Sequence, residues 1–394
     1  MRLLRLTFEH LNLFEEQRLS LGLFASDRVA SDCGVTPLEA PIYSQNLLAL
    51  AGINATGKTT VLRLLHGALG ILMGKALSED LVNLLFTLSA DRVIMNSTFF
   101  HKDSYYQLRT TFEIEATKDG NYSLEEWVIA EEELWRSSRP VTKKALSSDE
   151  SFLQQAKRDR VRSELPQEIL DYLPDDVSMV TTITKDSRQY VSSSLFTDKM
   201  WLNLPEAAVD NTILQVFDDS IESCGHNSRF DWYELSFKDN DTSFYYNQSE
   251  DLSDVLSDGT IKGGNLVHQA TLALQTGGYL LVDEIENHLN KQLVGVILDL
   301  FESNDTNPHG AVLVFSTHYP ELLDFIKRKD NVYFLSRSHD HKIRATLYSS
   351  IVKRIENKKS EVFLANYVKG TAPRYATISA LRKYVGRLVN EDAR

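Results

Sequence analysis

Two glycines, a lysine and a pair of threonines are spaced over residues 52–60 in a way that can hold the phosphates of a nucleotide. The segment fits the pattern Gly-x-x-x-x-Gly-Lys-Thr. Glycines let successive backbone N–H groups curl around phosphate oxygens, the lysine neutralises the outer phosphates, and the first threonine hydroxyl can ligate Mg²⁺. We therefore expect a nucleoside triphosphate to be bound by Gly52, Asn54, Ala55, Thr56, Gly57, Lys58, Thr59 and Thr60.

The segments on either side of this loop predict the elements that must position it. Residues 46–51 are mostly apolar, which is typical of a buried strand. Residues 59–72 predict a helix whose positive end points at the bound phosphates. The alternative is a chance match in a glycine-containing turn, but the order of strand, loop and helix argues against it.

Two adjacent carboxylates, Asp283 and Glu284, follow the apolar run 279–282. A central strand delivers acids to a site in this way. Downstream of a phosphate-binding loop, Asp283 would hold Mg²⁺, usually through water, and Glu284 would orient and polarise the attacking water as general base. A strand that ends in a solvated acidic turn is the alternative.

A second apolar run, residues 311–315, ends in Ser316, Thr317 and His318. It predicts the next strand of the same parallel sheet. Ligands bind at the carboxyl ends of strands in open α/β sheets, so His318 is positioned to hydrogen-bond the γ-phosphate. Lys58, Glu284 and His318 are therefore the candidate catalytic residues.

The polar turn that contains Ser257 and Gly259 precedes a helix expected to run to about residue 275. The N-terminus of such a helix can hold phosphate. An ordinary helix cap is a strong alternative, because serine and aspartate are common capping residues.

The four motifs occur in the order found in ABC-type ATPases, and the set resembles the heads of the SMC, Rad50 and RecF proteins. The resemblance implies an α/β P-loop NTPase head with a mainly parallel core sheet and an antiparallel β subdomain, which binds ATP and Mg²⁺. It also implies head-to-tail dimers, in which Ser257 and Gly259 contact the ATP held by the opposite subunit. Residues 2–14 look like the first strand of such heads.

The signature Ser-Asp-Gly-Thr at 257–260, the sequence at 286–290 and the tail at 363–373 are closer to the AAA15 branch, which is similar to the ATPase part of OLD-family proteins. Free-standing members resemble ATPases of bacterial anti-phage defence systems of the PARIS, Septu and abortive-infection kind. That resemblance implies an ATPase that senses infection and controls a separate toxin or nuclease. Gln107 is a candidate Q-loop residue by position alone.

The spacing of the motifs predicts three regions. Residues 1–130 would form an N-terminal ATPase lobe, in which the alternating pattern over 98–127 indicates antiparallel strands. Residues 131–217 read as a helical lid insertion, too short and too rich in proline for a long heptad arm. Residues 218–394 would form a C-terminal ATPase lobe with a hairpin over 229–247 and a basic helical tail.

Charge is unevenly distributed along the 394 residues, which carry a net charge of −13. Residues 321–394 hold 16 Lys and Arg against 8 Asp and Glu, whereas residues 1–320 hold 26 against 47. The basic tail could bind nucleic acid, form a solvated surface or dock on the acidic body of another copy. The basic residues concerned are Lys327, Arg328, Lys329, Lys353, Arg354, Lys358, Lys359, Arg382, Lys383 and Arg387.

Composition favours a cytoplasmic enzyme with no membrane partner. Residues 1–5 lack the apolar run of a signal peptide, and the apolar stretch 61–73 is interrupted by arginine, histidine and glycines. Cys33 and Cys224 have neither metal-ligand spacing nor a disulfide framework.

The 76 residues after His318 contain no convincing second catalytic set, so we expect any effector chemistry on another protein. The main alternative function is a RecF-like DNA repair or recombination clamp, whose hydrolysis DNA would stimulate. The nonstandard signature and the large insertion disfavour the ATPase of an importer, and a scaffold that barely turns over is a further alternative.

Overall fold

The computed structural model describes residues 1–30, 34–89, 91–119, 122–137, 140–187, 189–194, 210–227, 229–240, 242–247, 249–352, 358–370 and 375–391. Cys33, Lys353, Arg354 and residues 371–373 of the tail lie outside these ranges.

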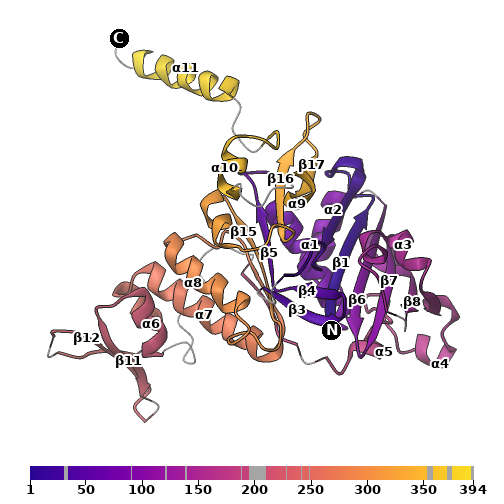
Figure 1. Ribbon diagram of the computed structural model, residues 1–394, viewed down its shortest axis with the longest axis horizontal. Helices are drawn as coiled ribbons and strands as arrows, with labels where there is room; N and C mark the ends of the chain where they lie inside the picture. The colour runs from indigo at the N-terminus through magenta and orange to yellow at the C-terminus, as the bar shows by residue number, and fades with distance from the viewer. Residues whose placement is uncertain are drawn as a thin grey trace.

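A six-stranded sheet of order β10-β14-β15-β5-β16-β17 forms the centre of the molecule (Figure 1). All neighbouring strands pair in parallel except β16 and β17. Every residue of β5, β14 and β15 is buried, which explains their continuous apolar sequences. The mainly parallel core sheet is therefore confirmed, with the strands Val191–Ser194 (β10), Tyr279–Val282 (β14), Val312–Thr317 (β15), Leu47–Ala51 (β5), Val332–Arg337 (β16) and Ile343–Leu347 (β17).

Helices cover both faces of this sheet because alternate residues of the strands point in opposite directions. Leu48 and Leu50 of β5 join the hydrophobic core around α1 (Lys58–Leu72) and α2 (Glu79–Leu88). Ala49 and Ala51 join the core around α7 (Asp258–Thr276) and α8 (Lys291–Glu302). The helices expected over 59–72 and 257–275 are thus formed within one residue of the predicted bounds.

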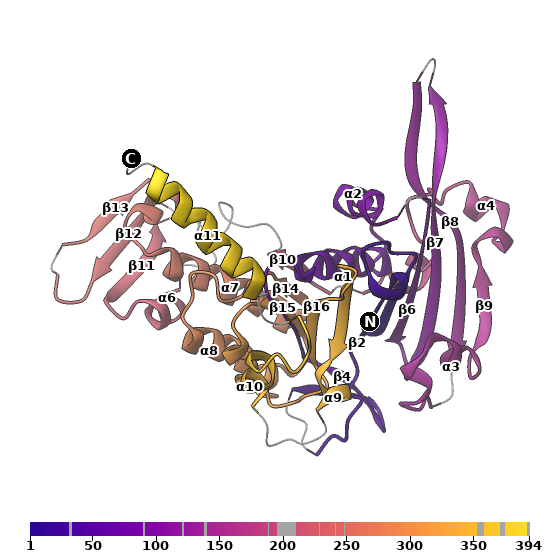
Figure 2. The same ribbon diagram turned by 90° about the horizontal axis from the view of Figure 1, so that it is seen from above.

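A second sheet, antiparallel and of order β2-β1-β6-β7-β8-β9, packs on the other side of α1 (Figure 2). Leu6, Met95 and Phe112 of this sheet share the buried core with Leu64 and Leu65 of α1. The expected antiparallel strands are formed, and α1 lies between two sheets. The bounds are Arg2–Glu9 (β1), Arg18–Gly22 (β2), Arg92–His101 (β6), Ser104–Asp119 (β7), Tyr122–Ser137 (β8) and Lys157–Val161 (β9).

The prediction of a helical lid over 131–217 is wrong for the described part of that segment. β8 continues to Ser137, β9 extends the antiparallel sheet, and β10 pairs with β14 at the edge of the central sheet. The prolines that interrupt the sequence leave only short helical segments between these strands. They are Ala145–Ser147 (η2), Asp149–Leu153 (α3), Arg162–Glu164 (η3), Gln167–Leu170 (α4) and Thr181–Thr184 (α5). Asn211–Phe217 (α6) follows β10.

A small unit precedes α7, and its core of Leu214, Ile221, Leu235 and Leu252 is completed by Ile261 of α7. It contains α6, the sheet β11-β12-β13 and the η6 turn, and it includes the hairpin expected over 229–247. Its bounds are Ile221–Asn227 (β11), Trp232–Phe237 (β12), Phe244–Tyr246 (β13) and Ser249–Asp254 (η6).

The remaining elements are a small hairpin near the N-terminus and the elements of the tail. The small hairpin of Val35–Glu39 (β3) and Ile42–Gln45 (β4) follows the first strands and the η1 turn Glu15–Gln17. The tail contains Pro320–Phe325 (η7), Tyr348–Ile351 (α9), Lys359–Leu364 (α10) and Tyr375–Glu391 (α11). None of the helices in the described ranges is long and apolar enough to cross a membrane.

Glu132 holds the irregular segment after β9 against the antiparallel sheet. Its side chain is completely buried and accepts hydrogen bonds from Thr110, Ser178 and the backbone N–H of Met179, at 3.1, 2.6 and 2.7 Å. Arg162 pairs with the same carboxylate at 3.3 Å. The segment after β9 is therefore held by this buried hydrogen-bond network, and not by the packing of helices that the sequence predicted for residues 131–217.

We expect Glu132→Ala to destabilise the protein by about 3–5 kcal/mol, because it removes the buried counter-ion of Arg162 and leaves only the exposed carboxylate of Asp175, 3.8 Å away. Glu133→Ala is the matched control: Glu133 is half-buried beside Arg158, and its removal should cost less than about 1 kcal/mol. Urea titration followed by circular dichroism measures both. Equal midpoints for the two variants would contradict a structural role for Glu132.

Candidate phosphate-binding site

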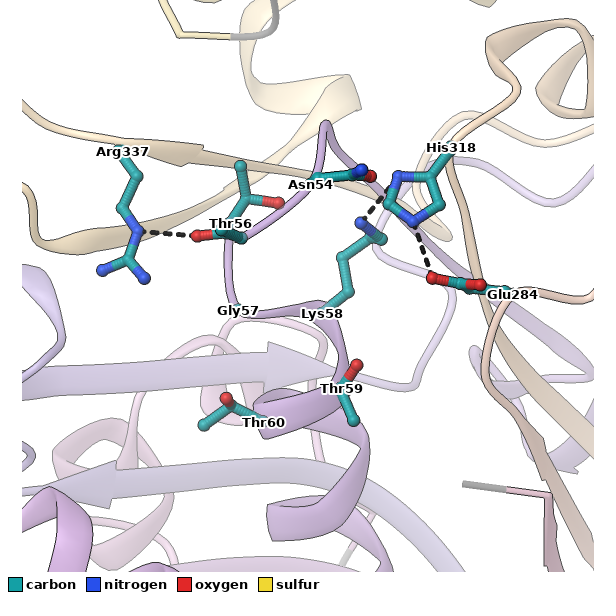
Figure 3. A pocket seen from close by; sticks show the side chains of 10 residues that line it. Asn54, Thr56, Gly57, Lys58, Thr59, Thr60, Glu284, His318 and Arg337 are labelled. Carbon is teal, nitrogen blue, oxygen red and sulfur yellow. Dashed lines mark hydrogen bonds and ion pairs between the residues drawn. The ribbon is translucent and has the colours of Figure 1, made fainter. Parts of the chain in front are cut away.

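The loop between β5 and α1 is built to receive phosphate. Gly57 caps α1 with φ 92, a left-handed conformation that glycine adopts without strain, and Ala55 also has a positive φ of 61. The helix that follows directs its free N–H groups into the loop. A pocket of about 250 Å³ lies above it (Figure 3), lined by Asn54, Ala55, Thr56, Gly57, Lys58, Thr59, Thr60, Glu284, His318 and Arg337.

Lys58 folds back over the loop. Its Nζ donates hydrogen bonds to the backbone oxygens of Gly52 and Ile53, at 2.9 and 3.1 Å, and lies 3.1 Å from Nδ1 of His318. Burial lowers the pKa of Lys58 to about 8, although Asp283, Glu284 and Glu286 oppose the shift. The carboxylates around Lys58 therefore do not fully compensate its buried charge, and a triphosphate would supply further negative charge.

Thr59 and Asp283 form the oxygen pair that a Mg²⁺ ion requires. Thr59 Oγ1 donates to Oδ2 of Asp283 at 2.6 Å, and the other carboxylate oxygen accepts from the hydroxyl of Ser316. Hydroxyl and carboxylate oxygens are the ligands that Mg²⁺ prefers, together with phosphate oxygens of a nucleotide. The residues present fit that ion, which would neutralise charge on the phosphates. No group of three or more His, Cys, Asp or Glu side chains with the geometry of a metal site occurs in the described ranges.

Glu284 and His318 form the other side of the pocket. Nε2 of His318 lies 2.9 Å from Oε1 of Glu284, so Lys58, His318 and Glu284 form a continuous hydrogen-bonded chain. The chain is satisfied when Nε2–H donates to the carboxylate and Nδ1 accepts from the ammonium group. Glu284 has φ 48, a strained conformation that costs about 1–3 kcal/mol and concentrates at functional sites.

Three residues that the sequence analysis missed support the site. Ser316 also accepts a hydrogen bond from the backbone N–H of Glu284 at 2.8 Å, and Glu286 accepts one from the N–H of His318 at 2.6 Å. Arg337 lies on the opposite side of the loop from His318 (Figure 3) and donates to the backbone oxygen of Ala55 at 2.8 Å. All three lie at or just beyond the carboxyl end of a central strand. Polar residues at that position in the sequence are the signal by which they could have been predicted.

The backbone of Arg337 also lies close to Gly370. A Cβ placed on Gly370 would lie 3.0 Å from the backbone oxygen of Arg337. The backbone of the residue that holds the phosphate loop is therefore packed closely against Gly370.

Ser257 and Gly259 do not line the pocket of their own chain. Ser257 caps α7 by accepting from the N–H of Thr260 at 3.1 Å, as the helix-cap interpretation requires. A Cβ on Gly259 would lie 2.6 Å from the backbone oxygen of His288, so glycine permits close packing of this turn on the segment after Glu286. Gln107 lies in β7, is buried and is absent from the pocket lining.

A phosphate loop, a Thr–Asp pair and a polarised carboxylate on a mainly parallel sheet define the class of P-loop NTPases. Residues 47–324 match the family described as "AAA domain, putative AbiEii toxin, Type IV TA system", and the chain belongs to that family. Membership implies a nucleotide-hydrolysing ATPase, and AAA ATPase domains in general bind ATP with Mg²⁺. No curated protein matches the chain.

Lys58→Ala should weaken ATP binding by about 100-fold or more, because it removes the only ammonium group that lines the described pocket. Isothermal titration calorimetry with Mg-ATP measures the change. Lys75→Ala, at an exposed position beyond α1, is the control and should bind like the wild type.

ATP binding should take up a proton above pH 8. The pKa of Lys58 is about 8 in the free protein, and the bound triphosphate raises it, so affinity should fall about tenfold per pH unit above 8 until the higher, bound-state pKa is reached. Calorimetry at pH 9 in two buffers of different ionisation enthalpy should give an uptake approaching one proton per site. An affinity independent of pH between 8 and 9 would contradict this assignment.

Proposed function

We propose that this protein is an ABC-type switch ATPase that binds ATP and Mg²⁺, hydrolyses ATP and forms head-to-tail dimers. The observation that carries the proposal is the hydrogen-bonded chain Lys58–His318–Glu284 beside the Thr59–Asp283 pair. Lys58, Thr59, Glu284 and His318 line the same pocket as the phosphate loop, where the outer phosphates of ATP would bind.

The arrangement assigns a role to each group in hydrolysis. Glu284 orients a water molecule and accepts its proton as the oxygen attacks the γ-phosphorus, and the bond to the β,γ-bridging oxygen breaks. Lys58 stabilises charge on the β- and γ-phosphates, and His318 senses the γ-phosphate through its ring. After that phosphate leaves, His318 has no γ-phosphate to contact and stays hydrogen-bonded to Glu284.

The dimer proposal rests on the separation of the signature turn from the pocket. α7 leads through a short turn into β14, so the N-terminus of α7 lies toward the carboxyl edge of the sheet, where the pocket also lies. Ser257 and Gly259 stand at that N-terminus but do not line the pocket of their own chain. A second copy related by a twofold axis would present them to the opposite pocket.

The biological role follows from the family and from the resemblance to defence ATPases. The description of the family names a toxin of a type IV toxin–antitoxin system. We infer that the ATPase senses phage infection and, through its nucleotide state, restrains or releases a separate toxin or nuclease. Its cytoplasmic location is part of the same proposal.

A DNA clamp of the RecF type is the second candidate, favoured by exposed basic residues. Arg382, Lys383 and Arg387 lie on the surface of α11. Much of the remaining positive charge of the tail is engaged within the chain: Lys327 pairs with Glu302, Arg328 with Asp330, and Lys329 with Asp27. Because these side chains already pair with carboxylates, less positive charge is left to bind DNA, which favours the switch over the clamp. Hydrolysis stimulated by DNA would instead support the clamp.

Glu284→Gln should abolish hydrolysis while preserving ATP binding, and sedimentation velocity should show that ATP strengthens its self-association relative to the nucleotide-free protein. The amide fills the same volume but cannot accept the proton of water. Substitution of the exposed Glu321 by Gln is the control and should hydrolyse ATP normally. Unchanged turnover in Glu284→Gln would indicate a scaffold rather than a hydrolase.

Mixing two inactive variants tests whether one active site is built from two subunits. Ser257→Asp keeps the helix cap but places a negative charge against the partner's triphosphate, whereas Ser257→Asn keeps the cap without charge. Ser257→Asp and Lys58→Ala should each be inactive alone, and their mixture should recover up to about a quarter of wild-type turnover. A mixture without activity would overturn the composite site.

A further inference from the structure

The C-terminal helix α11 stands apart from the body of the molecule (Figure 1). Its large apolar side chains are exposed rather than packed on the rest of the chain. Ile378, Leu381, Val385 and Leu388 are between 39% and 62% exposed. Burial of these side chains against another surface would stabilise the helix, so the exposed stripe indicates a binding surface.

The spacing of these side chains is that of a coiled-coil seam. The intervals between Ile378, Leu381, Val385 and Leu388 are three, four and three residues, which places them at positions a, d, a and d of two heptads. They form one narrow stripe along the helix. Lys383 and Arg387 fall at positions f and c, away from the stripe, and Gly386 falls at position b.

The residue types in the seam favour a particular partner. β-branched residues at a with leucine at d favour two parallel strands, and both a positions here are β-branched. In that pairing Arg382, at position e, faces Thr377 of the other helix at position g, so no like charges meet across the seam. An identical helix therefore matches the apolar pattern of this one, and Arg382 faces no like charge across the seam.

We propose that α11 is a dimerisation helix that pairs in parallel with α11 of a second copy of this chain. The contact goes beyond the proposed ATPase switch and does not depend on it, because none of the seam residues lines the nucleotide pocket. Two heptads are short, so the pairing is weak alone and gains from any second contact between the heads. It would keep two copies together while their pockets are empty.

Disulfide trapping in the full-length protein tests the pairing without nucleotide. Leu381→Cys places a thiol at a d position, where parallel helices bring the two copies into contact, and mild oxidation should yield a covalent dimer on a non-reducing gel. Lys383→Cys, two residues away at an outward position, is the matched control. We expect at least about ten times more dimer from Leu381→Cys.

The native cysteines set the background of this experiment. Cys224 is buried, and burial raises the pKa of its thiol to about 11, so it reacts slowly. The unmodified protein, oxidised in parallel, measures what remains. Leu381→Cys in the Lys58→Ala background should cross-link equally well, which separates this contact from any ATP-dependent dimer.

Sedimentation velocity without nucleotide provides the second measurement. Leu381→Asp combined with Val385→Asp should raise the dissociation constant of self-association at least about tenfold, whereas Lys383→Asp with Arg387→Asp should leave self-association intact. The seam variant should still bind ATP, since α11 lies outside the pocket.

Three results would overturn the proposal. Equal cross-linking of Leu381→Cys and Lys383→Cys would indicate random collision. Monomeric wild-type protein that floats with anionic phosphatidylserine vesicles through the same seam residues would assign the helix to a membrane surface. A disulfide that joins the Leu381→Cys thiol to Cys224 of a second copy, instead of to the other α11, would assign the helix to the sheet β11-β12-β13.

Discussion

The parallel pairing of four strands is the constraint on which the site depends. β14, β15, β5 and β16 lie in a register that brings Val282 level with Phe315 and Thr317 level with Ala51. The residues that follow each strand therefore meet at one edge, although up to about 280 positions separate them in sequence. The loop, the carboxylates, the histidine and the arginine lie close together because of this register. A slip of one residue would exchange the side chains that face the two helical layers.

The sequence allowed the core of this arrangement to be predicted because its signals are local. The spacing around Lys58 encodes a turn before a helix, and the apolar runs before Asp283 and His318 encode buried strands. Each motif needs only its immediate neighbours to be recognised. Asp283 with Thr59, and His318 with Lys58 and Glu284, are brought together as expected.

Other parts of the structure depend on contacts that no short pattern carries. Lys157–Val161 forms an edge strand because β8 offers a partner, although its own sequence is dominated by charge. Glu132 looks like one acid in a charged run, yet its environment is closed by residues more than 40 positions away. Arg337 is part of the site only because its side chain contacts the backbone of the phosphate loop at Ala55. Tertiary context decides such cases.

The contact of Arg337 with both Ala55 and Gly370 ties two distant parts of the chain to one residue. The guanidinium of Arg337 holds the phosphate loop, while its backbone lies against Gly370. A side chain added at Gly370 would therefore press on the backbone of the residue that anchors the loop. Gly370 is far from the nucleotide site in sequence, yet its lack of a side chain leaves room for the residue that shapes that site.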